Sequence, residues 1–280
     1  MKSTGVVHGA VSLVNAIATG RGATLGIGLK VRATIEYGAG SGITSESENL
    51  SSRLVINTVQ KVVSKKDLLR NKIAVFVESE IPTGYGLKSS SAISSAVALA
   101  CAKVFRPRFT DRQILLAGVE ASIESKVSIT GAYDDACSCY FGGFNVTDNQ
   151  KRRRVAYSRA PPGLTVVIFI PKNRKRGRVR DLRCTPRVFE KAWNLARNGK
   201  YWEAMNINGF AAASVLNSNP ALTAQLIGAG ALGASVSGNG PAVAAVAKNA
   251  DVPGIKKIFS SLDGRVITSG VNNRGSGHGV

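Results

Sequence analysis

Residues 204–247 contain no aspartate, glutamate, lysine or arginine, although the whole chain has 37 basic and 17 acidic residues and a formal charge of +20. A long uncharged stretch cannot form an ordinary solvated surface, because these four residue types are the ones most often exposed. It must be mostly core, or backbone that faces a ligand. With 280 residues, of which 44% are apolar, the chain can build such a core in one large domain or two of ordinary size.

Hydrophobic periodicity predicts strands and helices that alternate in both halves of the chain. We expect strands at 25–37, 72–79 and 164–170, and helices at 51–63, 89–105, after the capping box of Thr110 and Gln113, and after Pro186. The polar, basic stretch 151–183 is the candidate boundary, so we predict domains over 1–155 and 156–280. The pattern indicates an α+β or α/β fold in two modules.

The segment IPTGYGLKSSSAISSAVALA, residues 81–100, follows a predicted strand and opens a predicted helix. Free backbone N–H groups and the positive end of the helix dipole favour an anion in this context. Gly84 and Gly86 let the backbone wrap around a ligand, and Lys88 adds a charge beside three serines. Local physics leaves two interpretations open, a phosphate-binding loop and a well-capped structural helix.

The turn SGNGPA, residues 237–242, lies inside the uncharged stretch. By itself it is either functional or a tight loop between strands. Together, however, the two segments resemble two motifs of the GHMP kinases (galacto-, homoserine, mevalonate and phosphomevalonate kinases). IPTGYGLKSSSA is similar to that family's proline-x-x-x-glycine-leucine-x-serine-serine-alanine motif, and SGNGPA is similar to its C-terminal glycine-rich motif.

The N-terminal segment HGAVSLVNAIATGRGATLGI lies where the family has its first motif. Its NAIATGRG, the form GLKSSSA, and the segment TGAYDDACSCYFGG look most like the archaeal-type shikimate kinases. The resemblance covers nearly the whole chain. It implies an α+β GHMP kinase fold, with an N-terminal domain like ribosomal protein S5 domain 2 and a ferredoxin-like C-terminal domain.

The resemblance also implies ATP and Mg²⁺, and phosphorylation of shikimate to shikimate 3-phosphate in the chorismate pathway to aromatic amino acids. Homoserine and mevalonate remain alternative acceptors. Lys88 departs from the family's usual glycine, which leaves the backbone path there open. The residues that would hold the nucleotide phosphates or support their loop are Pro82, Gly84, Tyr85, Gly86, Leu87, Lys88, Ser89, Ser90, Ser91, Gly238, Asn239 and Gly240.

Phosphorylation of a hydroxyl requires its proton to be removed or oriented. Asp134 and Asp135 are the only charged residues between Lys126 and Asp148. Adjacent side chains on a helix do not face each other, so only one of the two is expected to enter a site. The resemblance implies a catalytic aspartate ahead of a Gly-Gly pair; we prefer Asp134 and keep Asp135 as the alternative.

Other candidate ligands carry less specific signals. Mg²⁺ prefers oxygen ligands, for which Ser90 and Glu124 are candidates, although Glu124 can equally be surface charge on an amphipathic helix. Asn15 and Arg21, in the N-terminal motif, are candidates for contacting the acceptor. A guanidinium binds a carboxylate through two hydrogen bonds, which would suit an acidic substrate.

The basic runs at 151–154 and 172–183 support a different class of function. They could bind nucleic acid, form a solvated loop, or receive the carboxylate of an acidic substrate. Neither run contains an aromatic residue on which single-stranded bases would stack, so nucleic acid is the less favoured partner. Four cysteines without framework spacing, and no apolar run of about 20 residues, predict a cytoplasmic protein without membrane association.

Overall fold

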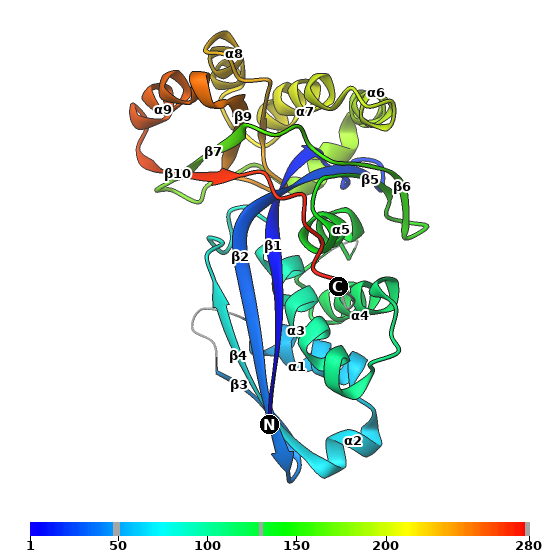
Figure 1. Cartoon of the computed structure of the whole chain (residues 1–280). Coiled ribbons are helices and arrows are strands. Elements are labelled where there is room, and N and C mark those ends of the chain that lie inside the picture. The colour runs from blue at the N-terminus through cyan, green and yellow to red at the C-terminus, as the bar shows by residue number, and fades with distance from the viewer. Residues whose placement is uncertain (47–50, 129–130, 278–280) are drawn as a thin grey trace.

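The structure is a computed structural model that describes residues 1–46, 51–128 and 131–277 (Figure 1). Its first sheet is built around a long antiparallel pair, β1 (Lys2–Val14) and β2 (Arg21–Ala39). The strand order is β3-β4-β2-β5-β6, and β1 pairs with β2 outside this path. The other strands of this sheet are β3 (Gly42–Glu46), β4 (Asn71–Ser79), β5 (Phe144–Asp148) and β6 (Arg153–Ser158).

Helices α1, α3, α4 and α5 lie together on one side of this sheet (Figure 1). The central helix, α3, is rich in alanine and serine and almost entirely buried. It packs so closely on β1 that a Cβ at Gly5 would lie 2.3 Å from the carbonyl oxygen of Ala96. Small side chains therefore bring the start of α3 close to the sheet. The helices of this half are α1 (Ser52–Val62), α2 (Lys65–Arg70), α3 (Ser89–Phe105), α4 (Asp111–Glu124) and α5 (Tyr133–Phe141).

A second antiparallel sheet, with the order β10-β7-β9-β8, lies at the other end of the molecule with helices α6 to α9 (Figure 1). Helix α7 packs against both β8 and β1, so the C-terminal half contacts the long strand pair directly. The elements here are β7 (Leu164–Pro171), β8 (Gly233–Val236), β9 (Val243–Lys248), β10 (Gly264–Gly270), α6 (Pro186–Arg197), α7 (Tyr201–Val215), α8 (Pro220–Gly228) and α9 (Val252–Ser260), with short 3₁₀ turns at Val179–Cys184 and Asn249–Asp251.

The α+β class is confirmed, and so are the predicted elements. Helix α3 begins at Ser89, Thr110 and Gln113 form the predicted capping box, and α6 begins at Pro186. Strand β1 was not predicted. Its last six residues are all buried, and a strand buried on both faces lacks the alternation by which strands are recognised.

The uncharged stretch is buried where it forms strands and only partly buried where it forms helices. Nearly all of 231–247 is buried, as expected. The outward faces of α7 and α8 are exposed instead, and Phe210 on α7 is 41% exposed. Alanine, serine, asparagine and glutamine supply most of that surface, so it stays hydrophilic enough without charge.

Two segments of the predicted C-terminal domain pack with the N-terminal half. Strand β6 crosses the predicted boundary between residues 155 and 156 and belongs to the first sheet. After β10 the chain returns to the N-terminal half, where the Gly143 amide donates to the Asn272 carbonyl and the Ser276 amide to the Tyr140 carbonyl, both at 2.7 Å. The last described residues, up to 277, therefore lie beside α5 (Figure 1). In the described part of the chain, no helix is both long and apolar enough to cross a membrane.

Candidate active site

The glycine-rich loop before α3 is held at both ends by buried side chains. Ile81 and Leu87 are 3% and 1% exposed, and between them the chain turns through Gly84 and Gly86, with φ of +85° and +83°. Lys88 then takes the left-handed conformation at the N-cap of α3, with φ 68° and ψ 23° and no side-chain cap. A glycine adopts this conformation without strain, so the loop keeps the path that a glycine at this position would give.

Helix α3 therefore begins without a side-chain cap. The first N–H groups of a helix have no partner inside it, and here they belong to Ser89, Ser90 and Ser91. All three serines line a cavity of about 280 Å³. An uncapped helix N-terminus that opens into a cavity, with hydroxyl groups around it, fits a phosphate.

The turn at 237–240 closes over this loop from the C-terminal half. The Ser237 hydroxyl donates to the Gly86 carbonyl at 2.9 Å, and the Ala242 amide donates to the Tyr85 carbonyl at 3.2 Å. A Cβ on Gly86 would lie 2.0 Å from the Ser237 carbonyl oxygen, so only glycine allows this approach. The two glycine-rich motifs, about 150 residues apart in sequence, thus form one structure.

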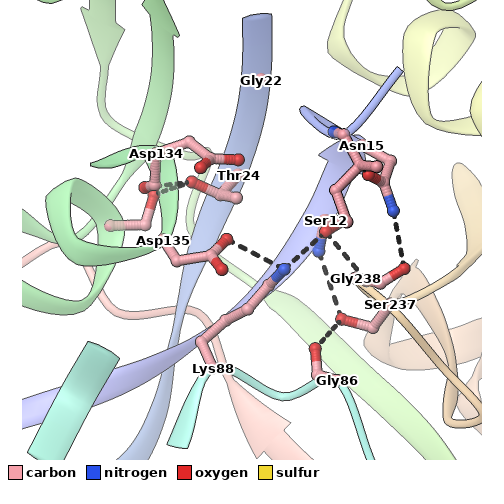
Figure 2. A network of polar contacts seen from close by, with 12 residues as sticks. Ser12, Asn15, Gly22, Thr24, Gly86, Lys88, Asp134, Asp135, Ser237 and Gly238 are labelled. Carbon is pink, nitrogen blue, oxygen red and sulfur yellow. Dashed lines mark hydrogen bonds and ion pairs between the residues drawn. The ribbon is translucent and has the colours of Figure 1, made fainter. Parts of the chain in front are cut away.

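The end of β1 forms the third wall. Figure 2 shows the Ser12 hydroxyl accepting a hydrogen bond from the Gly238 amide at 3.0 Å, and the Asn15 side-chain amide donating to the Gly238 carbonyl at 2.7 Å. The Asn15 backbone amide donates in turn to the side-chain oxygen of Asn208, on α7. These bonds fix the first motif and the glycine-rich turn relative to each other, and that turn holds the glycine-rich loop before α3.

Asp134 and Asp135 occupy the first turn of α5, where the helix dipole favours carboxylates. Figure 2 shows the Asp135 side chain turned toward Lys88. Asp135 forms an ion pair with Lys88, with its Oδ1 2.9 Å from Nζ, and its side chain is 16% exposed. The Oδ1 of Asp134 accepts a hydrogen bond from the Asn149 side-chain amide at 2.7 Å. The two side chains take different partners, as helix geometry predicts, but both line the same cavity, so the expectation that only one of them enters the site is wrong.

Asp134 is the more deeply buried of the two carboxyls. Its Oδ2 lies against Gly22 of β2, where a Cβ would be 2.2 Å away, and the residue is 4% exposed. Burial, followed by the charge of Asp135, raises the pKa of Asp134 to about 7, against the opposing effect of Lys88. A carboxyl poised near neutrality in a cavity is typical of functional sites.

The cavity brings together most of the predicted site residues. Two cations besides Lys88, namely Lys126 and Arg176, also line it. In the described part of the chain, neither of the two forms an ion pair with a carboxylate. The predicted residues that line the cavity are Asn15, Gly84, Gly86, Lys88, Ser89, Ser90, Ser91, Asp134, Asp135, Gly238 and Asn239.

The structure does not bring Arg21 and Glu124 to the cavity. Arg21 pairs with Glu190 at 2.7 Å and stacks on the Trp193 ring, and Glu124 pairs with Lys61. Four other predicted residues belong to the glycine-rich loop or the turn but do not line the cavity; they are Pro82, Tyr85, Leu87 and Gly240. Glu124 therefore contacts neither the phosphate loop nor the two aspartates, which removes the structural argument for it as a Mg²⁺ ligand.

Two residues that line the cavity, Ser12 and Arg176, and one that contacts Asp134, Gly22, were not predicted as site residues. Ser12 is a polar residue in an otherwise apolar run, and its side chain joins Lys88 to the glycine-rich turn. Gly22 belongs to the ATGRG segment and leaves room for the Asp134 carboxylate. Arg176 belongs to a basic run whose members could not be ranked; its Nη1 donates to the carbonyls of Asn239 and Gly240 at 3.2 Å each.

The sequence is similar to those of known kinases. Residues 53–143 match the family profile described as GHMP kinases N terminal domain. A shikimate kinase of Methanothrix thermoacetophila is 34% identical over 98% of this chain and 95% of its own length. A shikimate kinase of Methanosarcina acetivorans is 35% identical over 95% and 92%. The chain belongs to the GHMP kinase family.

Solved structures of GHMP kinases share the fold at low identity. The mevalonate kinase of Methanococcus jannaschii superposes with a TM-score of 0.76 at 13% identity, over 98% of this chain and 99% of that one. A homoserine kinase of Cytophaga hutchinsonii gives 0.75 at 18% identity, over 98% and 97%. At such identities the likeness shows the fold alone. GHMP kinases use ATP and Mg²⁺ to phosphorylate small molecules, which agrees with a phosphate loop that faces a pair of carboxyls.

Proposed function

We propose that this GHMP kinase phosphorylates the 3-hydroxyl of shikimate with ATP and Mg²⁺, a step of the chorismate pathway to aromatic amino acids. The observation that carries the proposal is the near full-length similarity, at 34% and 35% identity, to relatives named shikimate kinase. The cavity supports it with a phosphate loop on one side, carboxyls on the other and unpaired cations at its edge.

In this proposal Asp135 receives the proton of the acceptor hydroxyl. Its carboxylate is held by Lys88 and stays partly exposed, whereas Asp134 is enclosed by Asn149 and Gly22. The bond that forms joins the acceptor oxygen to the γ-phosphorus. The bond that breaks joins that phosphorus to the β–γ bridging oxygen, which keeps the electron pair and leaves on ADP. We therefore prefer Asp135 to Asp134 for this role.

The side chains at the cavity fit Mg²⁺ held mainly through phosphates and water. Within the described residues there is no group of three or more His, Cys, Asp and Glu side chains placed to hold a metal. Mg²⁺ in kinase sites keeps several waters and takes few protein ligands. The Ser90 hydroxyl, at the start of α3, is the candidate ligand on this chain. When bound, Mg²⁺ would neutralise the negative charge that develops on the phosphates.

The unpaired cations suit an acidic acceptor. Shikimate carries a carboxylate, and Arg176 lines the cavity with one of its guanidinium nitrogens anchored on the glycine-rich turn. The rest of its donor fork is free of ion pairs within the described chain, and a guanidinium binds a carboxylate or a phosphate with two parallel bonds. We assign the acceptor carboxylate to Arg176.

Several arginines of the basic runs make contacts within the chain, which does not favour nucleic-acid binding. Arg152 pairs with Glu120 at 3.0 Å, and the Arg154 guanidinium lies 4.4 Å from the Phe141 ring centre. In the second run Arg174 lies over the Tyr85 ring at 4.7 Å, Arg176 binds the glycine-rich turn, and Arg183 donates to the Ile17 carbonyl. Three arginines of the second run therefore contact segments at the cavity, although their side chains remain exposed.

A coupled assay of ADP release with ATP and Mg²⁺ tests the proposal, run in parallel with shikimate, homoserine and mevalonate. We expect turnover with shikimate alone and its loss in Ser90→Ala. The matched control is Ser261→Ala, an exposed serine far along the chain at the end of α9, which should keep full activity. Turnover with homoserine or mevalonate instead would replace the acceptor. RNA binding that weakens with salt, without any turnover, would contradict a kinase.

A further inference from the structure

We propose that Lys88 is a positioning residue of this site, which holds the Asp135 carboxylate toward the acceptor hydroxyl through its buried ammonium. The inference deepens the proposed function and rests on it for the identity of the acceptor. The place of Lys88 in the glycine-rich loop had indicated that it binds phosphates directly. The role proposed here is a different one.

The backbone of Lys88 is the first observation. A residue with a side chain rarely adopts the left-handed conformation, because its Cβ then crowds the following carbonyl. Lys88 does so at φ 68°, at the N-cap of the central helix α3. Such strained residues persist where the surrounding structure requires them, and they gather at functional sites. A glycine would serve the loop better, so the side chain itself must have a use.

The position of the ammonium is the second observation. The Lys88 side chain is 6% exposed, and its Nζ lies 2.8 Å from the Ser12 hydroxyl and 2.9 Å from the Asp135 carboxylate (Figure 2). The glycine-rich turn leaves room for it, because a Cβ on Gly238 would lie 2.7 Å from Nζ. An ammonium has three donors, and the third can reach an oxygen inside the cavity that Lys88 lines.

The charges around the two aspartates make Lys88 indispensable. Among the residues that the structure describes, Lys88 is the one cation within ion-pair distance of either carboxyl. The other titratable groups around Asp134 are Asp135 and the buried thiols of Cys137 and Cys139. None of these supplies positive charge. Lys126 and Arg176 line the same cavity but form no ion pair with either carboxyl in the described part of the chain, so without Lys88 the pKa of Asp134 would rise further.

Two variants distinguish a positioning role of Lys88 from phosphate binding and from a role in stability alone. Lys88→Met removes the charge and keeps the strained backbone, and Lys88→Gly removes the charge and relieves the strain. Asn217→Gly is the matched control, since Asn217 is a left-handed residue at the exposed end of α7. We expect both Lys88 variants to lose kcat by roughly 100-fold or more, with the Kd of ADP changed less than about tenfold. The control should change neither quantity.

The same variants give a readout that needs no acceptor. With ¹³C-labelled aspartate carboxyls, assigned through Asp134→Asn and Asp135→Asn, the titration of Asp134 should move to higher pH in Lys88→Met, because Lys88 lowers the pKa of that carboxyl. Unchanged titration in a folded Lys88→Met protein would overturn the proposal, and so would a large loss of ADP affinity with kcat retained. If no acceptor is turned over, the proposed function fails and the titration still decides the role of Lys88.

Discussion

Replacing Asp134 by asparagine should change how the stability of the protein depends on pH. The Asp134 carboxyl is 4% exposed, accepts a hydrogen bond from Asn149 at 2.7 Å and lies against Gly22. Its surroundings, burial above all, raise its pKa from 3.8 to about 7. The unfolded chain therefore loses this proton near pH 4, whereas the folded protein holds it until about pH 7.

The sign of the effect follows from proton linkage. Between these two pH values the folded state binds more protons than the unfolded state, so the free energy of unfolding falls as the pH rises. Below pH 4 there is no penalty, and above pH 7 the whole penalty is present. Each pKa unit corresponds to about 1.4 kcal/mol, so the displacement corresponds to roughly 4 kcal/mol at most. An asparagine has the shape of the protonated carboxyl and avoids the penalty.

The free energy of unfolding at pH 4.5, 6 and 8 is measured by urea unfolding, followed by the fluorescence of Trp193 and Trp202. Asp134→Asn should match the wild type near pH 4.5 and exceed it by roughly 2–4 kcal/mol at pH 8. Asp263→Asn, at an exposed aspartate, is the control and should keep the wild-type pH dependence. A constant difference between Asp134→Asn and the wild type across this range would refute the reasoning.

Three further predictions concern the loop, the acceptor and the metal. Gly86→Ala should lower the thermal midpoint and the affinity for ADP, because its Cβ would lie 2.0 Å from a backbone oxygen at a φ of +83°; calorimetry measures both, and an unchanged protein would mean that the two motifs separate easily. Arg176→Ala should raise the KM of the acceptor about tenfold or more with kcat nearly constant, while Arg180→Ala, at an exposed arginine of the same run, should not; a raised KM for ATP instead would place Arg176 on the nucleotide. Glu124→Gln should keep its activity and Mg²⁺ dependence, because its carboxylate pairs with Lys61 outside the cavity; a shifted Mg²⁺ requirement in steady-state kinetics would restore it as a ligand.

The local elements of the site followed from the sequence because short-range rules govern them. The start of α3 at Ser89 after a glycine-rich loop was predicted from the change in composition alone. The divergence of Asp134 and Asp135 was predicted from helix geometry. Both depend on residues within a few positions of one another, where the chain's own covalent geometry limits the outcome.

The sequence did not predict which residues the long charged side chains of the site contact. Lys88 was assigned to phosphates, and the fold directs its ammonium to Ser12 and Asp135, which are 76 and 47 residues away along the chain. Arg21 was expected at the acceptor, and the fold turns it toward Glu190 on α6. A long flexible side chain can reach several partners from one backbone position, so its local sequence does not select among them.

The sequence by itself determined alternating strands and helices in two modules, a glycine-rich loop before a helix and two adjacent carboxyls, because periodicity, glycine placement and the scarcity of acidic residues are local properties. The resemblance to the GHMP kinases added the choice of an α+β fold. Only the tertiary structure decided which charges meet. The approach of the 237–240 turn to Gly86, and of β1 to both, encloses Lys88 with Asp135 and Asp134 in one cavity. Burial strengthens electrostatic interactions and selects the protonation states, and burial depends on every segment that packs around the site.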